Sequence, residues 1–196
     1  MAGPDMNAYM YREYRAMAVL AAHYGEDPGY WRAKAASLRE LVNEFLWNEE
    51  LGFYLTYDVE EAQQINVKHG SGLMPLWTDI PSAKQAGRII EEHILNSAEF
   101  WGTHGVYSLD RSHPLFQDGS VSDLRGCGCG WNGPYWLPIN YVVYHAMRRH
   151  GYHEVANELL NRQIRLVEEC GDAGHNIQEY WLTDGKPGRL YPFSGW

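Results

Sequence analysis

Apolar side chains recur along most of this chain at intervals of three and four residues, which places them on one face of an α-helix. The first such run covers residues 6–24, and Gly25 ends it. Asp5 precedes the run and is expected to cap the helix. The face expected to be buried carries Met10, Tyr14, Met17, Ala18 and Ala21.

A second helix is predicted from the pair Asp27-Pro28, an N-cap residue followed by a proline in the first turn. A turn over residues 48–52 follows it, and the alternation of residues 53–58 predicts a short strand. The residues of this helix expected to point inward are Trp31, Ala35, Leu38, Leu41, Val42, Phe45 and Leu46.

The same organisation returns twice in looser form. Residues 69–77 and 82–95 predict a second helix pair, and residues 138–150 and 153–170 predict a third, separated at Gly151. The strand expected near the end covers residues 176–182, with Asp184-Gly185 as its turn. In the helix over 82–95, the inward positions are Ala86, Ile89, Ile90, His93 and Ile94.

Three helix pairs joined by long loops predict an all-α fold with a few short strands, arranged as a helical toroid or solenoid. A length of 196 residues fits one domain with one sizeable core. A closed ring of helix pairs needs about twice as many helices. We therefore expect residues 1–196 to form a single domain that corresponds to half of such a ring.

Charge and apolar run length exclude two classes of partner. The net charge of −9 opposes nucleic-acid binding, which needs clustered lysine and arginine. No run of 18 or more apolar residues occurs, and residues 1–5 do not resemble a signal peptide, so we expect no membrane contact.

Cysteine usage indicates the compartment. Cys127, Cys129 and Cys170 form an odd set, which favours a reducing, cytoplasmic location over a disulfide framework. Cys127 and Cys129 lack a second ligand pair at a suitable spacing, so we expect no metal and no other cofactor.

The most distinctive stretch is the glycine-rich and aromatic segment 130–141, which leads into the third helix pair. Indole and phenol faces beside amides suit a sugar, whose rings have apolar faces and a rim of hydroxyls. The alternative is that these aromatic rings only seal one end of a helical core. The candidate sugar contacts here are Trp131, Asn132, Gly133, Tyr135, Trp136 and Asn140.

The segment 101–130 has no helical period and is rich in glycine, serine, aspartate and histidine. Long loops inside compact domains are often functional. His104, which lies between Trp101 and Gly105, is the best histidine candidate for a sugar contact, and Trp101 is a candidate beside it. The other loop histidines, His69, His113 and His175, are expected to be hydrogen-bonded spacers.

At these residues the chain resembles the glycosidases of glycoside hydrolase family 63, with the trehalases as more distant relatives. The resemblance rests on Trp131-x-Gly133-Pro134-x-Trp136-x-Pro138-Ile139-Asn140-Tyr141, on Leu46-Trp47-Asn48-x-Glu50-x-Gly52-Phe53-Tyr54, and on Gly105-Val106-Tyr107-Ser108-Leu109. Asp5-x-Asn7-Ala8-Tyr9, Asn176-Ile177-x-Glu179-Tyr180 and Phe193-Ser194-Gly195-Trp196 extend it over nearly the whole chain. It implies a partial (α/α)6 toroid, the C-terminal half of such a catalytic domain.

The resemblance also implies an activity, the hydrolysis of α-glucosidic or α-mannosidic bonds with inversion. Glu179 matches the position of the family's general base, and Tyr180 and Trp181 beside it become candidate sugar contacts. An inverting enzyme needs a carboxylate that activates water, held roughly 6.5 to 9.5 Å from the acid. By residue type alone, a glutamate in such a place is more often a solvated surface residue.

Two departures from the family pattern bear on activity. The glycine-Met-Asp-Asn type motif that carries the family's general acid does not occur in this sequence, and Asn132 stands where the family commonly has arginine. We therefore expect the chain alone to be a weak or inactive hydrolase. The candidates for a substitute acid are Asp5, Asp110, Asp118 and Asp123, each of which also fits a turn or cap.

A second hypothesis is a non-catalytic module. Half a toroid leaves apolar faces without neighbours, so the chain would bind carbohydrate or another protein and complete its core as a homo-oligomer or with a separate N-terminal half. Under both hypotheses the expected ligand is a saccharide with an α-glucosyl or α-mannosyl residue.

Overall fold

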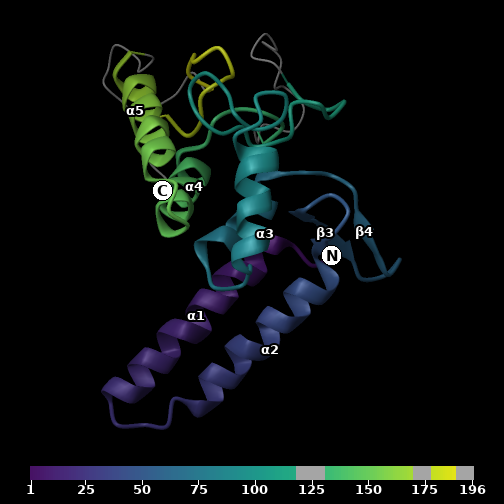
Figure 1. Cartoon of the computed structure of the whole chain (residues 1–196), viewed down its shortest axis with the longest axis vertical. Coiled ribbons are helices and arrows are strands. Elements are labelled where there is room, and N and C mark those ends of the chain that lie inside the picture. The colour runs from purple at the N-terminus through teal and green to yellow at the C-terminus, as the bar shows by residue number, and fades with distance from the viewer. Residues whose placement is uncertain (118–130, 170–177, 189–196) are drawn as a thin grey trace. The chain divides into compact units, whose positions relative to one another are not determined.

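The computed structural model describes residues 1–117, 131–169 and 178–188 of the chain (Figure 1). Its backbone separates into two compact units, Met1–Arg88 and Ile89–Trp196. Helices dominate both units, in agreement with the expected all-α class.

The first unit begins with a helical hairpin formed by α1 (Pro4–His23) and α2 (Gly29–Phe45), which lie side by side in Figure 1. The predicted caps are wrong by one or two residues. The N-cap of α1 is Gly3 in an extended conformation, and Pro4 begins the helix, so Asp5 lies in the first turn instead. Asp27 Oδ1 accepts a hydrogen bond from the Gly29 N–H (2.8 Å), one residue outside the Pro28 cap of α2.

The predicted inner face of α1 is only partly confirmed. Its buried residues are Pro4, Ala8, Tyr11, Ala18 and Ala21, whereas Met10 and Met17 are 45% and 37% exposed. The reason is that α1 packs against both α2 and a later helix of this unit, so burial follows those two contacts rather than the largest side chains. In α2, Ala35 and Val42 are buried, while Leu41 and Phe45 remain exposed.

Two small antiparallel sheets follow α2. Strand β1 (Trp47–Asn48) pairs with β2 (Phe53–Tyr54), and β3 (Thr56–Asp58) pairs with β4 (Gln63–Ile65). The predicted strand over 53–58 is therefore present but interrupted at Leu55, and its pairing strands β1 and β4 were not predicted.

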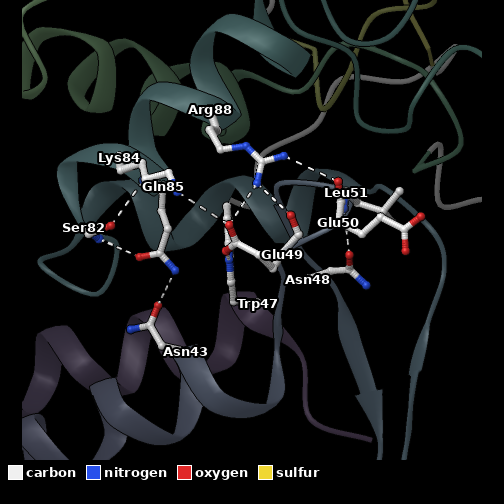
Figure 2. A network of polar contacts seen from close by, with 10 residues as sticks. All are labelled: Asn43, Trp47, Asn48, Glu49, Glu50, Leu51, Ser82, Lys84, Gln85 and Arg88. Atoms are coloured by element: carbon white, nitrogen blue, oxygen red, sulfur yellow. Dashed lines mark hydrogen bonds and ion pairs between the residues drawn. The ribbon is translucent and has the colours of Figure 1, made fainter.

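A polar network joins the end of α2, the turn after β1 and the helix α3 (Ala83–Arg88), as Figure 2 shows. Arg88 Nη1 donates to the Glu49 carbonyl (2.7 Å) and lies 3.6 Å from the Glu49 carboxylate. The Trp47 indole N–H donates to the same carboxylate (2.6 Å) and lowers the pKa of Glu49, with smaller contributions from Lys84 and Arg88. The network ties three segments of the first unit together.

The helix predicted over 69–77 is present as a 3₁₀-helix, η1 (Gly70–Trp77). His69 Nδ1 accepts a hydrogen bond from the Ser71 N–H (3.2 Å) and so caps it. Gly72 is required here, because a Cβ at that position would lie 2.3 Å from both the Phe53 ring and the Tyr54 carbonyl.

The helix predicted over 82–95 crosses from the first unit to the second as α3 and the π-helical segment η2 (Ile89–Ile94). Its inward face is predicted correctly, since Ala86, Ile89, Ile90, His93 and Ile94 are all buried.

The second unit is built around α4 (Leu137–Arg149) and α5 (His153–Glu169), which pack against each other. Gly151, with φ +89°, separates them as predicted. The core between them includes Val143, Met147 and Leu159, each without exposed surface.

The strand predicted over 176–182 is not present in the part that the structure describes. Residues 178–180 are irregular, and Trp181 makes only isolated bridges to Tyr135 and Pro187. The predicted turn at Asp184-Gly185 is present, with hydrogen bonds from the Leu182 N–H to Lys186 O (2.8 Å) and from the Gly185 N–H to Leu182 O (2.9 Å).

Candidate active site

The entrance of α4 presents three stacked aromatic rings in the second unit. The Trp131 and Trp136 rings lie 3.9 Å apart at 8°, and the Tyr180 ring stacks on Trp136 at 5.1 Å and 23°. Trp136 is the N-cap of α4, and Pro138 in the first turn fixes the direction in which the chain enters the helix. Trp136 and Tyr180 are buried, so Trp131 is the partly exposed end of the stack.

Backbone pairing brings three distant segments to this place. Tyr135 and Trp181 exchange two hydrogen bonds (2.7 and 3.0 Å), and Tyr135 also forms a bridge to Tyr107. The rings of Tyr107 and Tyr135 stack at 4.9 Å. The predicted platform is therefore joined directly both to the loop before it and to the segment that carries Glu179.

Glu179 is half-buried, and its Oε2 atom is closed off from solvent. It is the neighbour in sequence of Tyr180, the buried end of the ring stack. The structure thus brings the predicted base and the predicted platform into one region of the second unit. Its assignment as the base stays a prediction.

The predicted sugar contacts divide into two groups by exposure. Trp101, His104, Trp131 and Asn132 are half-buried and can meet a ligand at the surface. The second group has almost no exposed surface: Gly133, Tyr135, Trp136, Asn140, Tyr180 and Trp181. For the buried group, sugar contact likewise stays a prediction.

Asn140 on α4 holds the loop before the platform. Its Oδ1 accepts from the Val106 N–H (2.7 Å), and its Nδ2 donates to the carbonyls of Val106 (3.1 Å) and Trp136 (2.9 Å). One buried amide thereby fixes the Gly105-Val106-Tyr107 segment against the start of α4.

His104 lies at the tip of that loop, with its ring edge-on to Tyr135 at 5.7 Å. Burial lowers its pKa below the ordinary value of 6.5, which favours the neutral imidazole at neutral pH. A neutral imidazole can both donate and accept a hydrogen bond, as a sugar hydroxyl can.

The aspartates considered as substitute acids have different surroundings. Asp110 is buried, and its Oδ1 accepts from the N–H and the hydroxyl of Ser112 (both 2.8 Å), the turn role that its sequence also fits. Asp5 lies in the first turn of α1 in the other unit. Asp118 and Asp123 lie outside the described residues, as do His175, Cys127, Cys129 and Cys170.

Two residues that contact the loop were missed from the sequence. Arg162 on α5 donates to the Gly102 carbonyl, and Gln163 Nε2 donates to the His104 carbonyl (2.6 Å). The signal available was Glu158 four residues before Arg162, which also describes an ordinary exposed ion pair. Nothing in that spacing points to a loop some 60 residues earlier.

Among the described residues, no group of three or more histidine, cysteine, aspartate or glutamate side chains could hold a metal ion. Across the same ranges, no helix combines the length and apolar character needed to span a bilayer.

Comparison with known proteins identifies relatives over nearly the whole chain. The family model of the mannosylglycerate hydrolase MGH1-like glycoside hydrolase domain matches residues 1–187. Mannosylglycerate hydrolase from Rubrobacter radiotolerans is 32% identical over 169 residues, which cover 84% of this chain and 36% of that protein.

Solved structures agree in fold. The GH63 mannosylglycerate hydrolase from Thermus thermophilus matches with a TM-score of 0.79 and 25% identity, over 94% of this chain and 41% of that one. Neutral trehalase from Saccharomyces cerevisiae matches in fold, with a TM-score of 0.77 and 17% identity over 95% of this chain and 35% of its own. These neighbours confirm the predicted (α/α)6 class, and this chain spans about two fifths of the mannosylglycerate hydrolases.

Proposed function

Because this chain belongs to the family of mannosylglycerate hydrolase MGH1-like glycoside hydrolase domains, we propose that it provides the general base and part of the sugar-binding surface of an inverting glycosidase. One observation carries the proposal: half-buried Glu179 directly precedes Tyr180, the buried end of the Trp131–Trp136–Tyr180 ring stack. A carboxylate beside stacked aromatic rings is the arrangement in which a sugar ring and an activated water can meet.

In the proposed reaction Glu179 removes a proton from a water that attacks the anomeric carbon. An acid on the opposite side of the sugar protonates the departing oxygen, so the configuration at that carbon inverts. The sequence contains no counterpart of the family's acid motif. The proposed acid is therefore either one of the aspartates considered as substitutes, such as Asp118 or Asp123, or a carboxyl group of a separate N-terminal half.

The proposed substrate class is an α-mannoside or an α-glucoside. The relative from Rubrobacter radiotolerans is named a mannosylglycerate hydrolase, which makes mannosylglycerate the first compound to test. Half-buried Trp131 would pack on an apolar sugar face, while Asn132 and His104 would hydrogen-bond its hydroxyl rim.

The test compares the wild-type chain with Glu179→Gln and with Glu168→Gln, an exposed glutamate of α5 as the matched control. Hydrolysis of mannosylglycerate and maltose is followed by NMR, which also reports the anomer released. Without its acid the chain should react about 10² to 10⁴ times more slowly than a complete enzyme. We expect Glu179→Gln to remove that residual rate and Glu168→Gln to keep it. An unchanged rate in Glu179→Gln would show that the base is another residue.

A second candidate function is a non-catalytic module that pairs through apolar surface. Exposed apolar side chains on the first hairpin favour it, with Leu20 at 48%, Leu41 at 47% and Met10 at 45%. Size-exclusion chromatography with light scattering tests it, together with saccharide titration of tryptophan fluorescence. Dimers that bind saccharide without turnover would support this candidate, and a monomer with measurable turnover would exclude it.

A further inference from the structure

The loop between Trp101 and Tyr107 is fixed at alternate residues by side chains from α4 and α5. The Gly102 carbonyl accepts from Arg162 Nη1, and the His104 carbonyl accepts from Gln163 Nε2 (2.6 Å). Asn140 binds both backbone groups of Val106. Each attachment uses the main chain of the loop, so none of these hydrogen bonds involves the side chain of Trp101 or His104.

Arg162 is suited to this role by its surroundings. Its guanidinium lies 4.6 Å from the centre of the Trp101 ring, and its Nε and Nη2 atoms donate to Glu158 (3.1 and 2.5 Å). The side chain is 18% exposed, and it is held on one side by the ion pair and on the other by the indole. A planar guanidinium that donates both to Glu158 and to the loop positions the loop more sharply than a flexible lysine would.

The two polar atoms of the Gln163 amide differ in their hydrogen bonding. Its Nε2 binds the His104 carbonyl, whereas its buried Oε1 accepts no hydrogen bond within the described residues. The side chain also lies close to the loop, because a Cβ on Gly105 would come within 2.3 Å of Nε2. The amide therefore serves this loop and no other polar group of the described chain.

We propose that Arg162 and Gln163 are positioning residues, which act through the backbone of residues 102–104 to orient Trp101 and His104 toward a bound saccharide. The inference rests on the proposed function, because it concerns the same sugar-binding surface. Positioning groups matter because a displacement of about 1 Å in a contact residue can lower the reaction rate about a hundredfold.

The charge of Arg162 also reaches His104, and this effect must be separated from positioning. Burial is the main cause of the lowered pKa of His104; Glu169 and Asp184 raise the pKa, whereas Arg162 and Arg165 lower it. Arg165→Ala removes one of these cations without removing any hydrogen bond to the loop, so it is the matched control for Arg162→Ala.

The experiment measures the affinity of the intact chain for methyl α-mannoside and methyl α-glucoside by calorimetry. The variants are Arg162→Ala, Gln163→Leu and Arg165→Ala. We expect the first two to weaken binding about tenfold or more and Arg165→Ala to stay within about twofold. Gln163→Leu keeps the buried volume and removes the donor to the His104 carbonyl, and Arg162→Lys should recover part of the affinity.

Amide hydrogen exchange and thermal unfolding separate positioning from general stability. Faster exchange confined to residues 101–106, with an unchanged unfolding midpoint, supports the inference. Equal affinity in Arg162→Ala, Gln163→Leu and Arg165→Ala overturns it, and so does a loss of affinity that only accompanies lower stability of the whole chain. Failure of the proposed function is visible separately, because then the wild-type chain itself binds neither sugar.

Discussion

At the scale of single residues, Asn140 shows how a polar side chain can belong to the core. It is 1% exposed, and its three hydrogen bonds all go to backbone groups of residues 106 and 136. From its sequence it was a candidate sugar contact. Its described partners show that it joins the loop to α4, and its role as a sugar contact stays a prediction.

Removal of the Asn140 amide should therefore destabilise the chain. Asn140→Ala leaves the N–H and carbonyl of Val106 buried without that partner, which costs about 1 to 3 kcal/mol for such a group. Urea unfolding at pH 7 measures this loss. Asn161→Ala, at an exposed position on α5, provides the control and should change the free energy of unfolding by less than about 0.5 kcal/mol.

His104 gives the chain a pH dependence with a definite sign. Because burial lowers its pKa in the folded state, the unfolded chain binds more protons than the folded one once the pH falls below 6.5. The stability contribution is complete above pH 6.5 and is lost as the pH falls below that value. Urea unfolding between about pH 7.5 and 5 should therefore show that the free energy of unfolding falls less steeply with pH in His104→Gln than in the wild type. The difference in slope should correspond to less than one proton. Parallel profiles would mean that His104 is not the group responsible.

At the scale of elements, the start of α3 depends on a reciprocal cap. The Gln85 N–H donates to Ser82 Oγ (3.2 Å), and the Ser82 N–H donates to Gln85 Oε1 (2.8 Å). Gln85 Nε2 also donates to Asn43 Oδ1 (3.0 Å), so the cap joins α3 to α2, as seen in Figure 2.

We expect Ser82→Ala to lower stability by about 1 kcal/mol, the usual cost of losing such a cap. Gln85→Ala should cost more, because it removes both the Gln85 Oε1 acceptor of the Ser82 N–H and the contact with Asn43. Thermal unfolding of both variants measures the difference, with Lys84→Ala, which removes only an exposed ion pair with Glu49, as the control in the same turn. If Gln85→Ala proves the milder variant, the link to α2 contributes little.

Helix existence was predictable at this scale, whereas helix faces and caps were less so. The burial of Ile89, Ile90 and Ile94 followed directly from their spacing, because large side chains in a short helix leave few alternatives. Most of the buried residues of α1 are alanines. Their burial depends on the packing partners of the helix, which the spacing of apolar residues does not reveal. The predicted strand ending at 182 is absent from the described residues for a similar reason, since Trp181 makes single bridges to distant Tyr135 and to nearby Pro187 instead of a continuous ladder.

At the scale of the molecule, the motif resemblance predicted the fold class and the family, because its segments keep their order along nearly the whole sequence. The sequence could not predict that Tyr107, Tyr135 and Trp181 lie together, because backbone pairing in the folded chain is what brings their segments together. The contribution of Arg162 and Gln163 could not be predicted, because their partners are backbone carbonyls, which every residue type carries.

The net charge of −9 sets one further property of the whole chain. The excess negative charges repel one another in the folded state. At 0.1 M, added salt largely screens charges that lie more than about 10 Å apart. Salt also weakens ion pairs such as Arg15–Asp79 and Lys84–Glu49, but such exposed pairs contribute only about 0 to 1 kcal/mol each. We therefore expect the thermal midpoint to rise between about 10 and 300 mM salt, concentrations chosen to span roughly 30 to 6 Å of screening length.

Glu60 and Glu61 test whether net repulsion is the cause. Both are exposed, and their backbone N–H groups, not their carboxylates, bind Asp58 Oδ1 (3.0 and 3.3 Å). The double variant Glu60→Gln and Glu61→Gln should therefore raise the free energy of unfolding at low salt by a few tenths of a kcal/mol, measured as a higher thermal midpoint. At high salt this difference from the wild type should disappear. Arg32→Gln, at an exposed position of α2, makes the net charge more negative and should have the opposite effect. A salt response that is the same in all three proteins would place the cause in specific ion pairs rather than in the total charge.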